Sequence, residues 1–195
     1  MGTTDDLTLA IDAAHAAGAL LQAHWNDRDL LTIDAKRQGD FVSQADHQSE
    51  ALLRDRLLGA NPDDGWLGEE TDARPGRRRW IVDPLDGTTN FLRGIAHWAV
   101  SIALEQDGQL VLGVVHDPLK AETFSAMTGS GLQLNGRRLD PAAPPGFDAA
   151  LFGTGLPFGN MPYIDDHAAD LARVLPGTAG VRRMGAAALD LAYVA

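Results

Sequence analysis

Apolar residues recur every three or four positions near the start of the chain, which is the spacing of one face of an α-helix. The positions on this face are Leu7, Ile11, Ala14, Gly18, Leu21 and Trp25. Thr3 followed by Asp6 resembles a capping box, so we expect the helix to begin there. Helical spacing returns in a second segment, at Ala45, Ser49, Leu52, Leu53 and Leu57.

The middle of the chain shows strand patterns instead. Residues 98–106 and 110–116 flank Asp107-Gly108, a pair that favours a β-hairpin turn. Alternate positions in the first of these strands are apolar or small, and this predicts a sheet covered by helices on both faces. Further strands are predicted at 30–33, 80–82, 122–127, 132–134, 151–152 and 181–184, and helices at 163–175 and from 185 onward.

A proline-rich stretch, Pro141-Ala142-Ala143-Pro144-Pro145-Gly146, is the strongest linker pattern in the chain. It predicts a boundary between an α+β half at residues 1–143 and the start of a second α/β half at residues 144–195. All the acidic motifs described below fall in the first half.

Composition narrows the class of protein. An apolar fraction of 45% is ordinary for a globular core, and a net charge of −11 argues against a nucleic-acid surface. The absence of cysteine excludes disulfides and thiolate chemistry. No apolar run has the length of a membrane span and no leader pattern begins the chain, so we expect a cytoplasmic protein that does not enter a membrane. The run Arg77-Arg78-Arg79 is interpreted as a solvated start of a strand, with contact to an anionic partner as the alternative.

The candidate chemistry centres on residues 83–91, Asp-Pro-Leu-Asp-Gly-Thr-Thr-Asn-Phe, which follow a buried strand. Pro84 biases Asp83 toward an extended conformation, and Gly87 permits a tight reversal. Asp83 and Asp86 would then face one small volume. Because like charges repel unless a cation lies between them, the pattern is typical of a Mg²⁺ site. An Asp-Gly turn with solvated acids fits the same residues.

Two other acidic segments are relevant to the choice between a Mg²⁺ site and a solvated turn. Gly68-Glu69-Glu70 follows a short apolar pair, and Asp46 and Glu50 are four residues apart on one face of the second predicted helix. A solvated helix face is the alternative reading of the last pair.

Taken together, these segments resemble the inositol monophosphatase family of Mg²⁺-dependent phosphomonoesterases. Asp40-x-Val42-Ser43-x-x-Asp46-x-x-x-Glu50 is similar to its D-x-V-T-x-x-D-x-x-x-E segment, with Ser in place of Thr. Gly68-Glu69-Glu70 matches G-E-E, and residues 83–91 match D-P-[IL]-D-G-T-x-N-F at every position. Residues 182–195 are similar to the stretch R-x-x-G-[ST]-A-A-L-D-L-A-Y-V-A. The resemblance implies a layered αβαβα sandwich of the inositol monophosphatase and fructose-1,6-bisphosphatase type.

The resemblance also implies a metal centre with two or three Mg²⁺ ions. Glu69, Asp83, the Leu85 carbonyl and Thr88 would surround one ion, and Asp83 would bridge to a second ion that Asp86 also binds. The metals would lower the pKa of a bound water and neutralise charge on phosphorus.

Catalytic and substrate-binding roles follow from the same resemblance. Asp46 would accept a hydrogen bond from Thr88, and this pair would orient the attacking water. The Gly87 and Thr88 amides would hold phosphate, with Glu69 and Asp86 beside the substrate. The turn Gly185-Ala186-Ala187 would supply further substrate contacts. Lys36 matches a family lysine, although an exposed lysine is the alternative.

The chain departs from the family pattern in one respect. The family continues into a W-D-x-A-A-G motif that supplies a ligand of the second metal, and this sequence contains no Trp-Asp pair. We therefore expect a C-terminally incomplete form of the fold. The expected reaction is hydrolysis of a small phosphorylated polyol, foremost myo-inositol monophosphate, by a homodimer. The alternatives are a histidinol-phosphatase, a fructose-bisphosphatase, a 3′-phosphoadenylate phosphatase, or a truncated interaction protein without catalysis.

Overall fold

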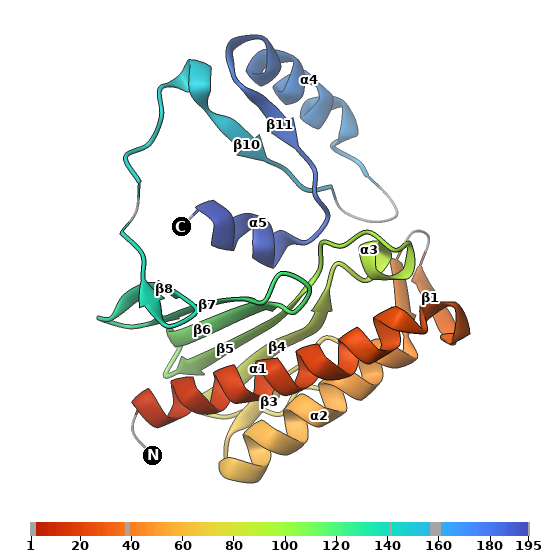
Figure 1. Ribbon diagram of the computed structural model, residues 1–195, viewed down its shortest axis with the longest axis vertical. Helices are drawn as coiled ribbons and strands as arrows, with labels where there is room; N and C mark the ends of the chain where they lie inside the picture. The colour runs from red at the N-terminus through yellow and green to blue at the C-terminus, as the bar shows by residue number, and fades with distance from the viewer. Residues whose placement is uncertain (1–2, 38–39, 141, 157–160, 195) are drawn as a thin grey trace.

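The computed structural model describes residues 3–37, 40–140, 142–156 and 161–194. At its centre is a seven-stranded sheet in the order β3-β4-β5-β6-β7-β8-β9 (Figure 1). β3 pairs with β4 in parallel, and the other neighbouring strands are antiparallel. The strands are β3 (Gly65–Leu67), β4 (Arg78–Asp86), β5 (Ala99–Gln106), β6 (Gln109–Asp117), β7 (Glu122–Met127), β8 (Gly131–Leu134) and β9 (Arg137–Arg138). The predicted hairpin around Asp107-Gly108 is the β5–β6 connection.

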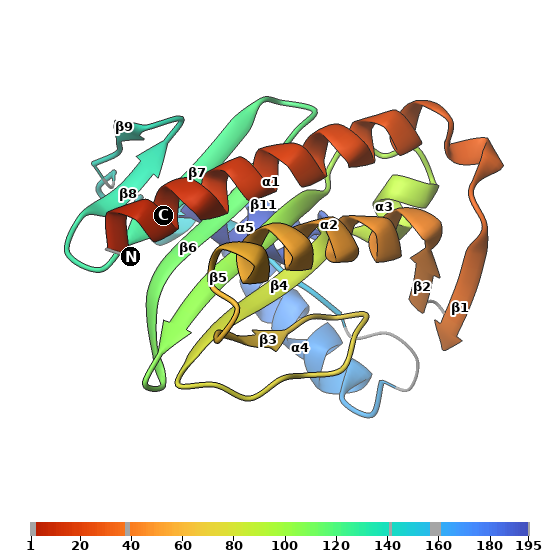
Figure 2. The same ribbon diagram turned by 90° about the horizontal axis from the view of Figure 1, so that it is seen from below.

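Helices cover both faces of this sheet. α1 (Thr3–Asn26) and α2 (Gln44–Ala60) lie side by side on one face, and α5 (Ala187–Val194) lies on the other (Figures 1 and 2). The interior between α1, α2 and the sheet contains large, fully buried side chains, among them Leu21, Leu53, Trp66, Trp80 and Trp98. The predicted sheet between helix layers is confirmed. Among the helices of the described ranges, none combines the length and apolar character of a membrane span.

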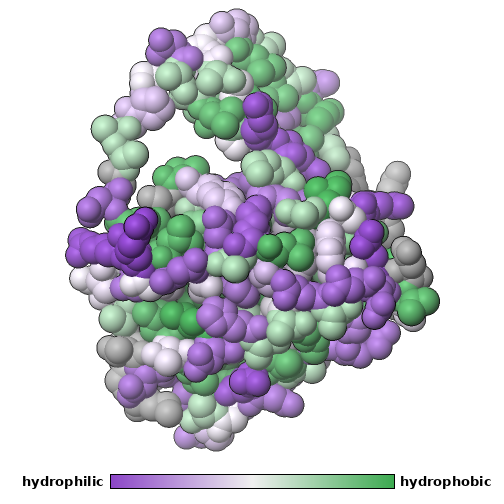
Figure 3. All heavy atoms as spheres, in the orientation of Figure 1, coloured by the Kyte–Doolittle hydropathy of each residue, from purple (hydrophilic) through white to green (hydrophobic). Residues whose placement is uncertain are grey.

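A smaller unit follows the proline-rich stretch. β10 (Leu151–Gly153) and β11 (Gly180–Arg182) form a parallel pair, and α4 (Ile164–Val174) connects them (Figure 1). A single helical turn at Phe147–Ala149 precedes β10, and another at Leu175–Gly177 lies between α4 and β11. The space-filling view shows an open gap between the connecting stretch and the part of the molecule that contains α5 (Figure 3). The division into halves at residue 143 stays a prediction.

One predicted strand is shifted. Residues 30–33 were expected to be extended, but Arg28–Leu30 forms a helical turn after α1 and the strand β1 begins only at Ile33. β1 (Ile33–Arg37) pairs with β2 (Asp40–Ser43) as an antiparallel hairpin apart from the main sheet. The strand propensity of these residues did not indicate that a helical turn follows the end of α1 and delays the start of the strand.

The arginine run at the start of β4 is not uniformly solvated, which corrects the interpretation from sequence. Arg78 donates to both carboxylate oxygens of Asp6, at 2.6 and 2.8 Å, and its Nε donates to Asp64 at 2.9 Å. The side chains of Asp6 and Asp64 are almost fully buried. A buried bidentate ion pair of this kind restrains orientation as well as charge. Arg78 therefore connects α1 to the start of β4.

Two histidines meet where α1 crosses β6. The ring centroids of His15 and His116 are 4.7 Å apart, and Gly18 leaves room for the edge of the His116 ring. His116 is 7% exposed. Burial and then the neighbouring His15 lower the pKa of His116 to about 4, against a weaker opposing effect of Asp117.

This pKa predicts that stability falls on acidification. Between pH 6.5 and pH 4 the unfolded chain takes up a proton that folded His116 rejects, so the free energy of unfolding decreases as pH falls. The loss is at most about 3 kcal/mol. We expect His116→Phe to flatten the dependence of urea unfolding on pH across this window. An unchanged slope would contradict the assignment.

Candidate active site

The acidic motif lies at the end of β4, where the strand reverses into α3 (Thr88–Leu92). Pairing of β4 with β5 is regular up to Asp83 and shifts between Asp83 and Asp86. Asp83 Oδ1 accepts a hydrogen bond from the Leu85 amide at 3.1 Å. Gly87 makes the reversal with φ of 97°, a conformation that side chains strongly disfavour. The predicted tight turn that aims both carboxylates at one volume is therefore present.

A cavity of about 180 Å³ opens above this turn. Most of the predicted site residues line it: Glu69, Asp83, Leu85, Asp86, Gly87, Thr88 and Gly185. Arg183, Thr89 and Asn90 line it as well and were not predicted as site residues. Segments from β4, α3, the loop after β3 and the loop before α5 thus meet at one place. Two of the three acidic segments line this cavity, and Asp46 of the third contacts it through Thr88.

The electrostatics of the cavity favour a cation. Burial, followed by the negative charges of Glu69 and Asp86, raises the pKa of Asp83 well above its usual value, and Asp83 also shares a hydrogen bond with Glu69. Burial likewise raises the pKa of Asp86, against the effect of two backbone amides. Repulsion between neighbouring carboxylates makes it costly for them to ionise. A bound divalent cation removes this repulsion, so the ionised carboxylates become favourable.

The donor atoms are the hard oxygens that Mg²⁺ prefers, so the residues fit such an ion chemically. Within the described ranges, however, no three acidic or histidine side chains are arranged closely enough to hold one ion as they stand. Glu69, Asp83 and Asp86 nevertheless line one cavity, and the charges of Glu69 and Asp86 both act on the pKa of Asp83. Asp86 also accepts a hydrogen bond from the Ala188 amide of α5.

Asp46 and Thr88 are hydrogen-bonded as expected. Thr88 Oγ1 lies 2.9 Å from Asp46 Oδ1 and 3.0 Å from the Leu85 carbonyl oxygen. Since a hydroxyl has one proton, it donates to one of these acceptors at a time. Asp46 is 1% exposed, and its Oδ2 accepts from the amide and hydroxyl of Ser43 in a capping box that begins α2. Burial raises the pKa of Asp46 more than these hydrogen bonds lower it.

The start of α5 contacts a carboxylate of the cavity directly. Asp86 Oδ2 accepts from the Ala188 amide at 2.6 Å, and the Ala187 amide also interacts with it. Gly185 lines the cavity, whereas Ala186 is fully buried, and neither Ala186 nor Ala187 belongs to the cavity wall. In this arrangement the Ala187 amide interacts with the Asp86 carboxylate. Direct contact of Ala186 and Ala187 with the substrate stays a prediction.

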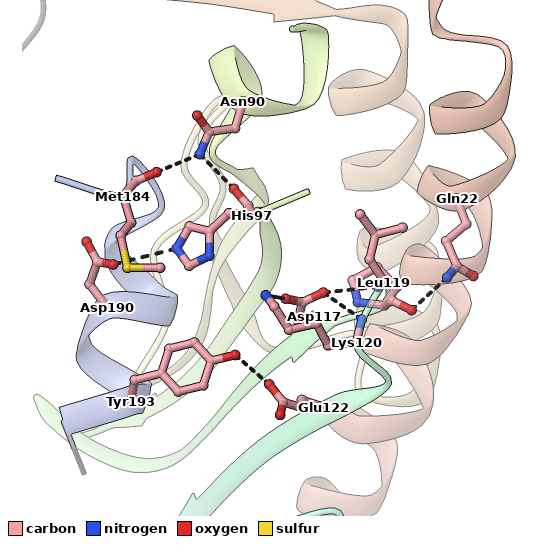
Figure 4. A network of polar contacts seen from close by, with 11 residues as sticks. Gln22, Asn90, His97, Asp117, Leu119, Lys120, Glu122, Met184, Asp190 and Tyr193 are labelled. Carbon is pink, nitrogen blue, oxygen red and sulfur yellow. Dashed lines mark hydrogen bonds and ion pairs between the residues drawn. The ribbon is translucent and has the colours of Figure 1, made fainter. Parts of the chain in front are cut away.

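Asn90 holds the loop before α5 in place. Its Nδ2 donates to the carbonyl oxygens of His97 and Met184, both at 2.8 Å (Figure 4). The Nε2 atom of His97 in turn lies 3.6 Å from Oδ1 of Asp190 in α5. The signature asparagine therefore connects α3, the start of β5 and the approach to α5. No local sequence pattern could indicate the contact with Met184, which lies 94 positions further along the chain.

Glu50 has a role that sequence reasoning left open. It is fully buried, which overturns the solvated reading of the Asp46 and Glu50 face. Its carboxylate accepts from the Glu70 amide at 2.7 Å, from the Thr71 hydroxyl and, at 3.4 Å, from Trp66 Nε1. Glu50 thus anchors the loop that presents Glu69 to the cavity. Lys36 lies in β1, and its side chain is outside the described part of the structure.

Comparison with known proteins agrees with this geometry. The sequence model of the inositol monophosphatase family matches residues 4–195. The chain belongs to the inositol monophosphatase family. Family members are phosphomonoester hydrolases, so the class of enzyme predicted from the motifs is confirmed, and the solved structures confirm the fold.

Relatives in the family carry two kinds of name. An inositol-1-monophosphatase of Rhizobium meliloti (strain 1021) is 43% identical over 192 residues, covering 97% of this chain and 72% of the relative. A protein named Nus factor SuhB, from Pseudomonas aeruginosa, is 42% identical over 197 residues with the same coverage of 97% and 72%.

Solved structures of the family superpose closely. The extragenic suppressor protein suhB from Bartonella henselae has a TM-score of 0.92 at 40% identity, covering 96% of this chain and 73% of that one. The Thermotoga maritima IMPase has a TM-score of 0.87 at 32% identity, covering 97% and 72%.

Proposed function

We propose that this chain hydrolyses a small phosphate monoester, foremost myo-inositol monophosphate, with Mg²⁺ as cofactor. The observation that carries the proposal is the convergence of Glu69, Asp83 and Asp86 on one cavity beside the hydrogen-bonded pair of Thr88 and Asp46. A volume of about 180 Å³ suits a phosphate on a small polyol. Membership in a family of phosphomonoesterases supports the same reaction.

Glu69, Asp83, the Leu85 carbonyl and Thr88 would hold one Mg²⁺, and Asp83 with Asp86 a second. Mg²⁺ at these oxygens supplies a lowered pKa for bound water and neutralises charge on the phosphoryl oxygens. To bind the second ion, the Asp86 carboxylate has to keep the Ala188 amide as an additional partner or lose this hydrogen bond.

The chain's own contribution is orientation and proton handling. When Thr88 donates to Asp46, its hydroxyl oxygen presents lone pairs to the cavity and accepts a hydrogen bond from a water there. Asp46 stays fixed because Ser43 holds its other oxygen at 2.6 and 2.8 Å. The water is thereby oriented toward phosphorus, and phosphoryl transfer depends mainly on such positioning. The Gly87 and Thr88 amides at the start of α3 would face the phosphate oxygens.

A direct test is release of inorganic phosphate from inositol 1-phosphate as Mg²⁺ is titrated, with histidinol phosphate, fructose 1,6-bisphosphate and 3′-phosphoadenylate for comparison. Thr88→Ala should lower kcat by about 100-fold, since it removes the group that orients water. Thr128→Ala, an exposed threonine in the turn after β7, is the matched control. Absence of Mg²⁺-dependent turnover on every substrate would refute the proposal.

Arg183 is the basic side chain among the described residues of the cavity wall, which makes it a candidate contact for an anionic substrate. We expect Arg183→Ala to raise KM by about tenfold while kcat changes little, because a charge-assisted hydrogen bond made equally in ground and transition states is lost. Arg182→Ala is the control, since Arg182 precedes it in the chain and does not line the cavity. An equal effect of both variants would contradict a specific role.

The name Nus factor SuhB, borne by a relative at 42% identity, favours a second candidate. In it the chain acts as a protein-interaction partner, alone or besides catalysis. Turnover measurements distinguish interaction alone from catalysis, because an interaction protein without catalysis releases no phosphate under any metal condition.

A further inference from the structure

A second cavity, of about 530 Å³, lies on the face of the sheet that α1 covers, where α1 borders β6 and β7. Its wall includes Ile11 and His15 from α1, His116 from β6 and Thr123 from β7. It shares no lining residue with the acidic cavity, and nothing in the proposed hydrolysis uses it.

Two imidazole nitrogens converge inside this cavity. His15 Nε2 lies 2.9 Å from Thr123 Oγ1, and His116 Nδ1 lies 3.0 Å from the same oxygen. The two rings are tilted by 59° with centroids 4.7 Å apart, so they do not stack in parallel. The nitrogens thus approach one point from two different elements.

Hydrogen-bond accounting shows that an imidazole lone pair takes part here. The Thr123 hydroxyl has one proton, so it can donate to one nitrogen, and the other nitrogen must donate to the hydroxyl oxygen. Burial and the neighbouring His15 lower the pKa of His116 to about 4, which keeps His116 neutral at physiological pH. Neutral imidazole is the form that binds metal ions, so His116 does not have to lose a cationic charge before it binds one.

We propose that His15 Nε2 and His116 Nδ1 form a binding site for a divalent transition-metal ion such as Zn²⁺, Ni²⁺ or Cu²⁺. The ion takes the place of the hydrogen bonds between the nitrogens and Thr123, and the N–H proton that pointed at the hydroxyl moves to the other nitrogen of its own ring. The intact Thr123 hydroxyl and water complete the coordination. Imidazole ligands select these ions over Mg²⁺, which prefers the oxygen ligands of the acidic cavity. His15 is exposed on α1 and can adjust toward the ion, whereas His116 is held in the sheet.

The test uses the untagged chain in excess Mg²⁺, which keeps the acidic cavity from competing for the added ion. Titration with Cu²⁺, followed by calorimetry and electron paramagnetic resonance, should show one equivalent bound with hyperfine coupling to imidazole nitrogen. His15→Ala should weaken this binding at least about tenfold and reduce the hyperfine coupling from two imidazole nitrogens to one. His24→Ala, a change on the same helix at a histidine that contacts Gln48, should leave both unchanged.

His15→Ala replaces an exposed helical side chain, so the variant is expected to fold, and a Thr123→Val variant provides a second measurement. Thr123→Val removes the competing hydroxyl but keeps both nitrogens, so nitrogen coupling should persist. Binding that survives His15→Ala unchanged, or that His24→Ala abolishes equally, would overturn the proposal. So would the absence of any Cu²⁺, Ni²⁺ or Zn²⁺ binding in the presence of Mg²⁺.

Discussion

Asp83→Asn is expected to lower kcat/KM for phosphate release by about 1,000-fold or more. In the proposed metal centre Asp83 is the carboxylate that would bind both ions, and Asn keeps its size while removing its charge. Metal-dependent stabilisation of the transition state amounts to several kcal/mol, and each 1.36 kcal/mol is a factor of ten in rate. Phosphate release measured against Mg²⁺ concentration checks this.

The same substitution should have the opposite effect on stability when metal is absent. The pKa of Asp83 is raised in the folded state, so its ionised form opposes folding, and this penalty grows as pH rises from the unfolded pKa through the folded one. At pH 7 without Mg²⁺, Asp83→Asn should therefore unfold at a higher temperature than the natural chain. Added Mg²⁺ should stabilise the natural chain more than the variant.

Asp107→Asn is the matched control for this experiment. Asp107 lies in the β5–β6 turn with φ of 53°, a conformation that Asn also tolerates, and its carboxylate pairs with exposed Arg77. It should change neither turnover nor the response to Mg²⁺. If Asp83→Asn behaved like Asp107→Asn in both assays, the metal role of Asp83 would be refuted.

Features encoded by local pattern could be predicted from the sequence. The periodic stripe of α1, the alternation in β5 and the Asp107-Gly108 turn each depend on residues close together in the chain. The tight turn at Gly87 was also foreseeable, because only the order of neighbouring residues decides it. The family motifs then placed these local pieces around one cavity.

Long-range pairings could not be predicted in the same way. The Asp86 carboxylate accepts from an amide 102 positions later, and Arg78 pairs with Asp6 72 positions earlier. The convergence of His15 and His116 on Thr123 likewise depends on how α1 lies across the sheet. Neither helical nor strand periodicity contains information about such partners, since each fixes only which face a side chain occupies.

Glu50→Ala should destabilise the fold by about 3 kcal/mol or more, because it removes a fully buried carboxylate together with the hydrogen bonds that it accepts. The Glu70 amide and the Thr71 hydroxyl lose this acceptor, whereas Trp66 Nε1 keeps the Thr71 hydroxyl oxygen at 3.1 Å. For a chain of this length the loss corresponds to a fall of about 6 to 12 °C in Tm. Thermal unfolding followed by circular dichroism measures it. Asp55→Ala, at an exposed position of the same helix α2, should stay within about 0.5 kcal/mol of the natural chain.

Activity should fall beyond what unfolding explains, because Glu50 also positions the loop that carries Glu69. A Cβ at Gly68 would lie 2.1 Å from Glu50 Oε1, so the carboxylate and the glycine backbone are packed directly against each other. Gly68→Ala should therefore displace the same loop without removing the acceptor, and lower kcat/KM at a temperature where the variant is fully folded. If Glu50→Ala lost stability but kept the kcat/KM of Asp55→Ala, Glu50 would be a structural anchor without influence on the cavity.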